Sequence, residues 1–327
     1  MTVVATGSIA FDYILSYAGR FRDHILLEKT HILNLSFLVD RLEKRRGGVA
    51  ANYAYNLALL GYPSAILATA GRDAGDYHDW LAARGIDVQG LRLVDDVMTA
   101  TGFTTTDSED NQLTGYYGGA MLRADALGLD DTVGDPEVVI VGPNAPAAMA
   151  RLVRECRDRN VRWVYDPSHQ LSSMDVADLK DGISGAWILI GNDYELELIQ
   201  QRTESDLAAL AQECGIVVTT KGRHGSRLTT RSVDIEAPAA AAHKEVDPTG
   251  AGDAYRAGLV ASLLQGLELD DAALVASLAA VYVVEQTGTV EHEYTRDEFA
   301  QRFATAFGKP CPPQLFKPAG LHLAREA

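Results

Sequence analysis

Short apolar runs alternate along the chain with segments of helical pattern. The runs are rich in β-branched residues and mostly apolar at every position, as in strands buried on both faces of a sheet. They lie at residues 3–5, 65–68, 138–141, 161–164, 187–190 and 216–219. Helical patterns occupy 50–60, 76–84, 147–158, 253–264 and 271–286. This alternation predicts an α/β fold with a central, mostly parallel sheet and helices on both faces.

Two segments interrupt this rhythm. Residues 11–46 contain no clear long helix, and residues 97–119 have the pattern of two polar, Thr-rich strands around a turn at 107–111. We interpret both as parts of a small β-structured lid, since insertions that cover a site commonly act as lids. No interdomain linker is evident, so we expect one α/β domain over 1–308 with this lid. A Pro-rich tail, 309–327, should be loosely ordered.

The charge balance excludes several classes of function. Among 327 residues, 29 are Lys or Arg and 45 are Asp or Glu, which gives a net charge of −16 and disfavours nucleic-acid binding. The longest apolar stretch, 272–284, is shorter than the about 20 residues of a membrane span. The three cysteines are scattered, and the N-terminus lacks the positive region of a signal peptide. We therefore expect a cytoplasmic protein that binds neither nucleic acid nor membranes.

The strongest chemical signal lies at residues 247–258. Pro248 disfavours helix at the preceding residue, Gly250, Ala251 and Gly252 form a small-residue turn, and a helix follows at once. Backbone N–H groups at such a helix start can bind an anion. Asp253 lies beside that site and would suit a general base that deprotonates an attacking hydroxyl. The alternative is an acidic residue that only complements the helix dipole, and glycine spacing alone leaves both open.

This segment resembles the C-terminal motif of the ribokinase-like (PfkB) family of small-molecule kinases, in which the final Asp is the catalytic base. Similar segments follow the family's order from residue 3 to about 305. They lie at 7–12, 46–61, 192–195 and 220–225. The resemblance implies transfer of phosphate from ATP with Mg²⁺, and it makes K⁺ a candidate activator.

The resemblance also implies residue roles. Ser8, Asp12, Gly48 and Asn52 would hold the substrate's sugar hydroxyls, and Glu195 would lie near Mg²⁺, through water. The ATP and anion site would comprise Asn192, Thr220, Gly222, Gly225, Gly250, Ala251 and Gly252. An ionised Asp12 accepts hydrogen bonds only, so it can take two vicinal hydroxyls, although an Asp after a strand can also just form a turn. Most of these residues follow predicted strands or glycine turns, where ligands of open α/β sheets bind.

Within the family, the chain most resembles bacterial, mycobacterial-type adenosine kinases. This resemblance implies that Ser36 contacts the ribose, that Phe103 and Tyr116 sandwich the purine, and that Gln170 binds the purine edge. The sequence departs from their pattern by Tyr116 in place of Phe and His169 in place of Gln. On periodicity alone, both aromatic residues could equally serve lid packing.

The resemblance thus implies phosphorylation of the 5′-hydroxyl of a nucleoside, adenosine to AMP, by a homodimer formed through the lid. The alternative is a kinase of the same family for a free sugar of ribose or fructose type, or for another nucleoside. A Rossmann dehydrogenase is disfavoured because no Gly-x-Gly-x-x-Gly follows the first strand. A P-loop enzyme is disfavoured because no Gly-x₄-Gly-Lys-Ser/Thr occurs.

Overall fold

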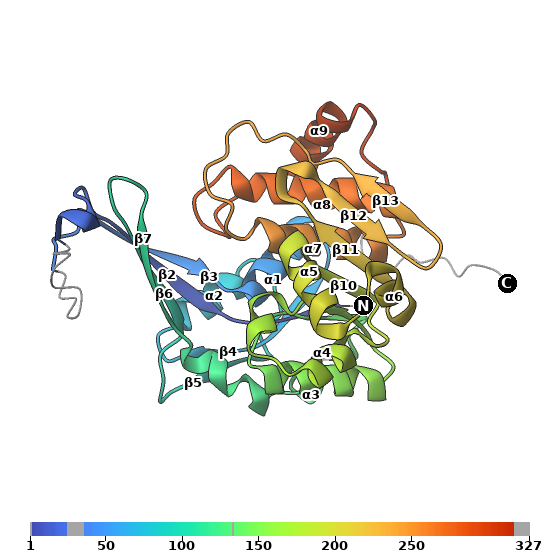
Figure 1. The fold of residues 1–327 in the computed structure, drawn as a ribbon, viewed down its shortest axis with the longest axis horizontal. Coiled ribbons are helices and arrows are strands. Elements are labelled where there is room, and N and C mark those ends of the chain that lie inside the picture. The colour runs from blue at the N-terminus through green and yellow to red at the C-terminus, as the bar shows by residue number, and fades with distance from the viewer. Residues whose placement is uncertain (1, 25–35, 133, 317–327) are drawn as a thin grey trace.

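The body of the protein is built on one large sheet. The structure, a computed structural model, describes residues 2–24, 36–132 and 134–316. Within these ranges, nine strands form a sheet in the order β13-β12-β11-β10-β9-β8-β1-β4-β5 (Figure 1). The seven strands from β11 to β5 are parallel, and β12 and β13 add an antiparallel edge.

All six apolar runs of the sequence are strands of this sheet. They are β1 (Val3–Thr6), β4 (Ser64–Gly71), β8 (Val138–Val141), β9 (Arg162–Tyr165), β10 (Ile188–Asn192) and β11 (Ile216–Thr220). The pattern missed β5 (Leu91–Val94), β12 (Ser226–Thr229) and β13 (Asp234–Ala237). These three lie at or next to the sheet edges, and β5 and β13 are largely exposed, so they lack a continuous apolar run.

Helices cover both faces of the sheet (Figure 1). The core on one face includes side chains of α1 (Val49–Leu59), α2 (Gly75–Ala82), α7 (Ala251–Leu264), α8 (Leu269–Val284) and α9 (Arg296–Phe307), of which α9 contacts α8. The other face packs against α3 (Pro146–Asp158), α4 (Val176–Ile183), α5 (Asp193–Thr203) and α6 (Leu207–Glu213). Alternate residues of β8 supply the two cores, Val138 and Ile140 to the first and Val139 and Val141 to the second. This confirms the predicted α/β architecture.

A second, four-stranded sheet projects from the body as the lid (Figure 1). It consists of β3 (Arg41–Gly47), β2 (Ala10–Ser16), β6 (Ala100–Thr106) and β7 (Gln112–Tyr117), in that order. Strands β2 and β6 are parallel, and the outer pairs are antiparallel. Because β2 follows β1 after only three residues, the root of the lid lies at the end of a central strand.

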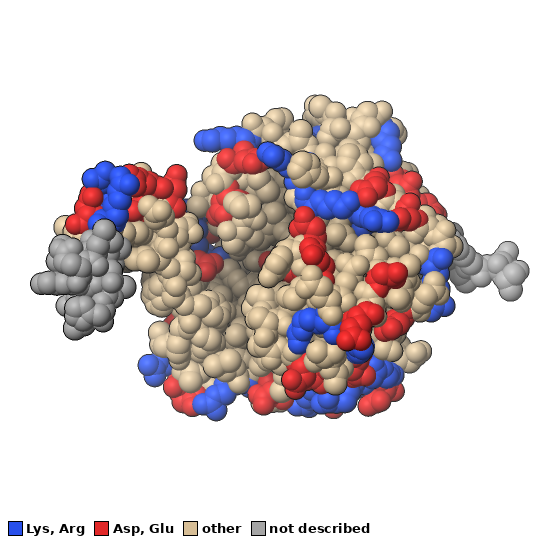
Figure 2. Space-filling model, viewed as in Figure 1, with Lys and Arg blue, Asp and Glu red and all other residues tan. Residues whose placement is uncertain are grey.

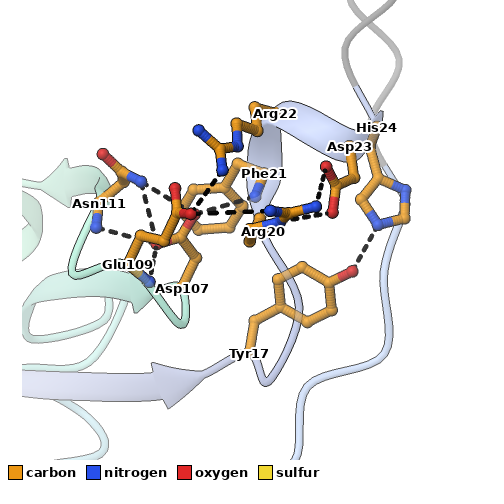
Figure 3. A network of polar contacts seen from close by, with 9 residues as sticks. All are labelled: Tyr17, Arg20, Phe21, Arg22, Asp23, His24, Asp107, Glu109 and Asn111. Atoms are coloured by element: carbon orange, nitrogen blue, oxygen red, sulfur yellow. Dashed lines mark hydrogen bonds and ion pairs between the residues drawn. The ribbon is translucent and has the colours of Figure 1, made fainter.

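The tip of the lid is held by one carboxylate (Figure 3). Asp107 accepts the backbone N–H groups of Phe21, Glu109 and Asn111, at 2.9, 2.9 and 3.0 Å. Burial acts to raise the pKa of Asp107, but these hydrogen bonds and the Asn111 side chain lower it to about 2. Arg22 adds an ion pair of 2.6 Å to Glu109. The short helix η1 (Phe21–His24) is thereby fastened to the β6–β7 turn.

The first part of the C-terminal tail is ordered against the body, contrary to expectation. Leu315 is buried, Phe316 contacts the ring of Phe299, and Lys309 Nζ lies 2.6 Å from Asp271. Pro-rich composition thus did not prevent packing, because two apolar side chains follow the prolines. Residues 317–327 lie outside the described part. In the described part, no helix combines the length and apolarity needed to cross a membrane.

Candidate active site

Most of the predicted site residues lie at the carboxyl edge of the large sheet. From β1 the chain proceeds to β4 on one side, whereas β8 lies on the other, so the strand order reverses at β1. Ligands of open α/β sheets bind in the crevice at such a reversal. Ser8 follows β1, Asp166 follows β9, and Asn192 and Thr220 end β10 and β11. The face in Figure 2 is visibly hollowed between the lid and the body.

A cavity of about 870 Å³ lies along this edge. Every residue predicted for the ATP and anion site lines it, namely Asn192, Thr220, Gly222, Gly225, Gly250, Ala251 and Gly252. Glu195 and Asp253 line it as well. Small and apolar side chains of α8, including Ala280, Val281 and Val284, line another part. The cavity therefore combines a polar, glycine-rich part with an apolar part, as a nucleotide's phosphates and base require.

The anion turn is defined here as Gly250, Ala251 and Gly252 at the start of α7. Gly250 has a φ of +82°, and a Cβ there would come within 2.8 Å of Thr289. Only glycine satisfies both conditions without strain. The turn opens a fourteen-residue helix, whose N-terminus attracts negative charge.

Asp253 follows the anion turn and is held from a second helix. Asn52 of α1 donates a hydrogen bond of 2.7 Å from Nδ2 to Asp253 Oδ2. Burial raises the pKa of Asp253 to about 7, although Arg256 and the Asn52 hydrogen bond act to lower it. The Oδ1 atom of Asn52 is buried without a hydrogen-bond partner in the described residues. An unpartnered buried acceptor thus lies beside a carboxylate that can exchange protons near neutral pH.

Asp12 occupies the base of the lid in a slot formed by two glycines. A Cβ at Gly47 would come within 2.6 Å of one Asp12 carboxylate oxygen, and a Cβ at Gly102 within 2.8 Å of the other. Burial and the nearby charge of Asp247 raise the pKa of Asp12. Tyr116 lies on the same face of the lid because it pairs with Gly102, which pairs with Asp12.

Ser8 and Gly48 meet where the lid joins the body. Gly48 has a φ of +96°, and a Cβ there would approach the Ser8 carbonyl oxygen to 2.5 Å. The Ser8 hydroxyl accepts the backbone N–H of Val49 at 3.2 Å, at the start of the helix that carries Asn52. The structure therefore brings Ser8, Gly48 and Asn52 to the junction from which the lid strand with Asp12 departs.

The expected aromatic sandwich does not form within one chain. Phe103 follows Gly102 on β6, and successive strand residues point to opposite faces. Phe103 stacks on Tyr13 with ring centroids 5.2 Å apart, on the face opposite Asp12 and Tyr116. Only Tyr116 of the predicted pair faces the site.

Ser36 also lies away from the site of its own chain. The next residue, Phe37, packs against Tyr17 and Phe21 at the lid tip. Asp40 hydrogen-bonds to Ser16 at the far end of β2, whereas Asp12 lies near its beginning. Four strand residues span about 13 Å, so Ser36 is remote from Asp12.

Gln170 belongs to the short helix η5 (Ser168–Ser172) after β9 but does not line the cavity. Its side-chain oxygen accepts a hydrogen bond of 2.7 Å from Ser173. Sequence reasoning missed its neighbour Ser168, which does line the cavity and donates to Glu195 at 3.1 Å.

Glu195 caps its own helix and still faces the cavity. Its backbone N–H is bound by Asn192 Oδ1, and its Oε2 accepts the Asn192 N–H, both at 2.8 Å. In the described residues, no group of three or more Asp, Glu, His or Cys could hold a metal ion. A single carboxylate nevertheless fits Mg²⁺, which takes most of its ligands from water and phosphate oxygens.

Sequence reasoning also missed a buried ion pair behind Asp253. Arg256 Nε lies 2.6 Å from Asp166 Oδ2, and Nη2 donates to Oδ1 at 2.9 Å. Tyr53 of α1 donates a hydrogen bond to the same Asp166 carboxylate. The sequence signal was weak, because an arginine in a helix is usually exposed and its partner lies 90 residues away.

Comparison with known proteins gives a consistent result. Residues 12–296 match the family model "pfkB family carbohydrate kinase". A nucleoside kinase of Methanothermobacter thermautotrophicus is 31% identical, over 95% of this chain and 98% of its own.

Two solved structures extend the comparison. A nucleoside kinase of Burkholderia thailandensis, solved with inosine, is 34% identical and superposes with a TM-score of 0.84, covering 95% of this chain and 99% of its own. The same protein was also solved with ADP-inosine, at a TM-score of 0.83. An archaeal nucleoside kinase of Methanocaldococcus jannaschii, 26% identical, has a TM-score of 0.84 and covers 93% of this chain and 98% of its own. From the match of its sequence and the architecture of its site, the chain belongs to the pfkB family of carbohydrate kinases.

Proposed function

We propose that this protein transfers the γ-phosphoryl group of ATP to the 5′-hydroxyl of a purine nucleoside. The observation that carries the proposal is Asp253, which follows the anion turn and is hydrogen-bonded by Asn52, whose buried Oδ1 has no hydrogen-bond partner in the described residues. The relatives in the comparison are named nucleoside kinases, and one was solved with inosine. Adenosine to AMP is the reaction that the sequence resemblance favours.

In the proposed reaction, Asp12 and Asn52 hold the sugar between the lid and α1. Asp253 accepts the proton of the 5′-hydroxyl as its oxygen attacks the γ-phosphorus in line, and ADP leaves. The anion turn and the α7 N-terminus stabilise the charge that develops on the transferred group. Glu195, with Ser168 beside it, would hold Mg²⁺ through water, and the ion would supply charge neutralisation to the phosphates.

The substrate test is ATP consumption with Mg²⁺ and K⁺ against adenosine, guanosine, inosine, cytidine, ribose and fructose. The proposal predicts the highest kcat/KM for a purine nucleoside. A preference for ribose or fructose would support the alternative, a sugar kinase of the same family. Structurally, Tyr116 is the aromatic residue facing the site, so Tyr116→Ala should weaken nucleoside use more than ribose use.

Potassium activation and dimerisation through the lid belong to the same proposal. Asp247 accepts the N–H groups of Thr249 and Gly288, at 2.9 and 3.2 Å, and so joins the segment before the anion turn to the loop after α8. A cation bound in this region would act on the turn directly. Equal rates in Na⁺ and K⁺ would remove the potassium hypothesis.

A further inference from the structure

One cationic side chain is buried directly behind the anion turn. Arg256 is only 6% exposed, and a buried arginine is rare unless it is paired. A Cβ at Gly252 would come within 2.7 Å of Arg256 Nη1, so the guanidinium underlies the last residue of the turn. Its Nη2 also lies 3.8 Å from Glu195 Oε2, in addition to the contacts with Asp166.

The ionisable groups around Arg256 come from four elements. Tyr53 extends from α1, Asp166 follows β9, Glu195 lies on α5, and Asp253 shares α7 with Arg256. Three carboxylates therefore surround one guanidinium at a place where phosphate groups would have to bind. Among the described residues, the other cationic side chain that lines the cavity, Arg223, is exposed, so Arg256 is the buried source of positive charge there.

We propose that Arg256, held by Asp166, is a positioning residue for phosphoryl transfer that orients Glu195 and balances the negative charge beside Asp253. The inference rests on the proposed function. The competing explanation is purely structural, namely that Arg256 only neutralises Asp166. Removing Arg256 alone cannot separate the two, because it leaves Asp166 buried without a counter-ion and destabilises the fold.

The decisive variant is therefore Arg256→Met with Asp166→Asn, which removes both charges and keeps an acceptor for Tyr53. The control is Arg302→Met with Glu285→Gln, since that pair, at 2.5 Å, is likewise an arginine–carboxylate pair, although more exposed, and joins α9 to the end of α8. Both double variants should fold. The measurement is kcat/KM of each from pH 5.5 to 9, with ATP and the best acceptor.

The proposal predicts that the acid limb of the double variant moves to higher pH, because Arg256 lowers the pKa of Asp253 more than Asp166 raises it, so the loss of the positive charge outweighs the loss of the negative one. At pH 7, kcat/KM should fall about ten-fold or more, a typical consequence of a misadjusted general base. The Arg256→Lys variant, which keeps the positive charge, should have an acid limb at a pH close to that of the wild type. The Arg302→Met/Glu285→Gln variant should have its acid limb at the same pH as the wild type. A wild-type pH profile and rate in the Arg256→Met/Asp166→Asn variant would overturn the inference.

A readout without turnover separates this inference from the proposed function. The Tm difference between the protein and its Asp253→Asn variant, measured against pH, reports the protonation of Asp253. In the Arg256→Met/Asp166→Asn background, the midpoint of this dependence should move to higher pH. An unchanged midpoint would overturn the inference, whereas an inactive wild-type protein with a shifted midpoint would refute only the proposed function.

Discussion

Asp253 is a carboxylate whose neighbours act on its protonation in opposite directions. Burial raises its pKa to about 7, while Arg256 and Asn52 favour its charged form and Asp166 and Glu195 oppose it. At neutral pH such a base is ionised in a large fraction of the protein molecules, yet it remains basic enough to take a hydroxyl proton. The protonation of one residue thus depends on four side chains, three of them from distant parts of the chain.

This balance has a consequence for stability. The pKa of Asp253 in the folded protein, about 7, exceeds the about 4 of an unfolded Asp, so the folded state binds the proton more tightly. Its contribution to stability is therefore complete below about pH 4 and is lost as the pH rises through 7. Asn cannot ionise and escapes this loss.

We expect Asp253→Asn to raise Tm relative to the wild type at pH 8, with a difference that shrinks towards pH 5. Thermal unfolding from pH 4.5 to 8.5 measures this. Asp297→Asn, which removes an exposed carboxylate from the first turn of α9, controls for a general effect of helix-start charge. A Tm difference that stays constant with pH would contradict the assignment.

At the residue scale, the sequence predicted many of the residues that line the cavity but not all of their surroundings. Asp253, Glu195 and the glycines of the anion turn could be predicted as a group because they belong to local segments with a recognisable pattern. The link from Asn52 to Asp253 spans 201 residues, and the support from Arg256 and Asp166 spans 90. Such contacts depend on the packing of α1 against α7, which no local pattern encodes.

The lid sheet leaves room for the Asp12 carboxylate because the residues beside it are glycines. Gly47 and Gly102 flank Asp12 on the neighbouring strands, and a methyl group at either would meet its carboxylate. Gly115, also in the lid, has no atom within 4 Å of an added Cβ. A Gly→Ala substitution should therefore disturb Asp12 at Gly102 but be tolerated at Gly115.

We expect Gly102→Ala to raise KM for the nucleoside about ten-fold or more, because it displaces a charged hydrogen-bond acceptor worth roughly 1.5–3 kcal/mol. KM for ATP should change little, since Asp12 is not among the residues that line the nucleotide cavity. Steady-state kinetics with each substrate varied separately provide the measurement. Gly115→Ala should behave as wild type, and equal effects of the two substitutions would refute the role of Asp12.

At the element scale, buried strands were predicted from the sequence better than exposed edge strands. The strands buried on both faces were predicted within a few residues, and so were β6 and β7 of the lid, whose turn at 107–111 matches the Asp107 network. The face of each lid residue was harder, because a shift of one residue reverses it. Phe103 shows this, since its neighbour Gly102 is the residue that pairs with Tyr116.

The whole molecule presents an apolar surface on the side of the lid facing away from Asp12. We define this outer lid face by Leu42, Phe103, Leu113 and Tyr117, which are 46–60% exposed and share one side of the sheet. Exposed apolar groups of this kind mark association surfaces, and β7 also offers an open edge. A net charge of −16 opposes self-association, so a dimer needs such a surface to form.

We expect the protein to be a dimer in solution and Leu113→Asp to convert it to a monomer. The added charge would have to be desolvated in the interface. Light scattering coupled to size-exclusion chromatography determines the mass. Gln112→Asp places the same charge on the neighbouring residue, which faces the other side, and should leave the dimer intact. A monomeric wild-type protein would contradict the proposed association.

The most direct test of the whole account is one product measurement. The protein and its Asp253→Asn variant are incubated with ATP, Mg²⁺ and a purine nucleoside, and the position of the new phosphate is determined by ³¹P NMR. The account predicts a nucleoside 5′-monophosphate, formed about 10²–10⁴ times more slowly by the variant, the usual effect of losing a general base. A phosphate on another hydroxyl, or undiminished turnover by Asp253→Asn, would contradict it.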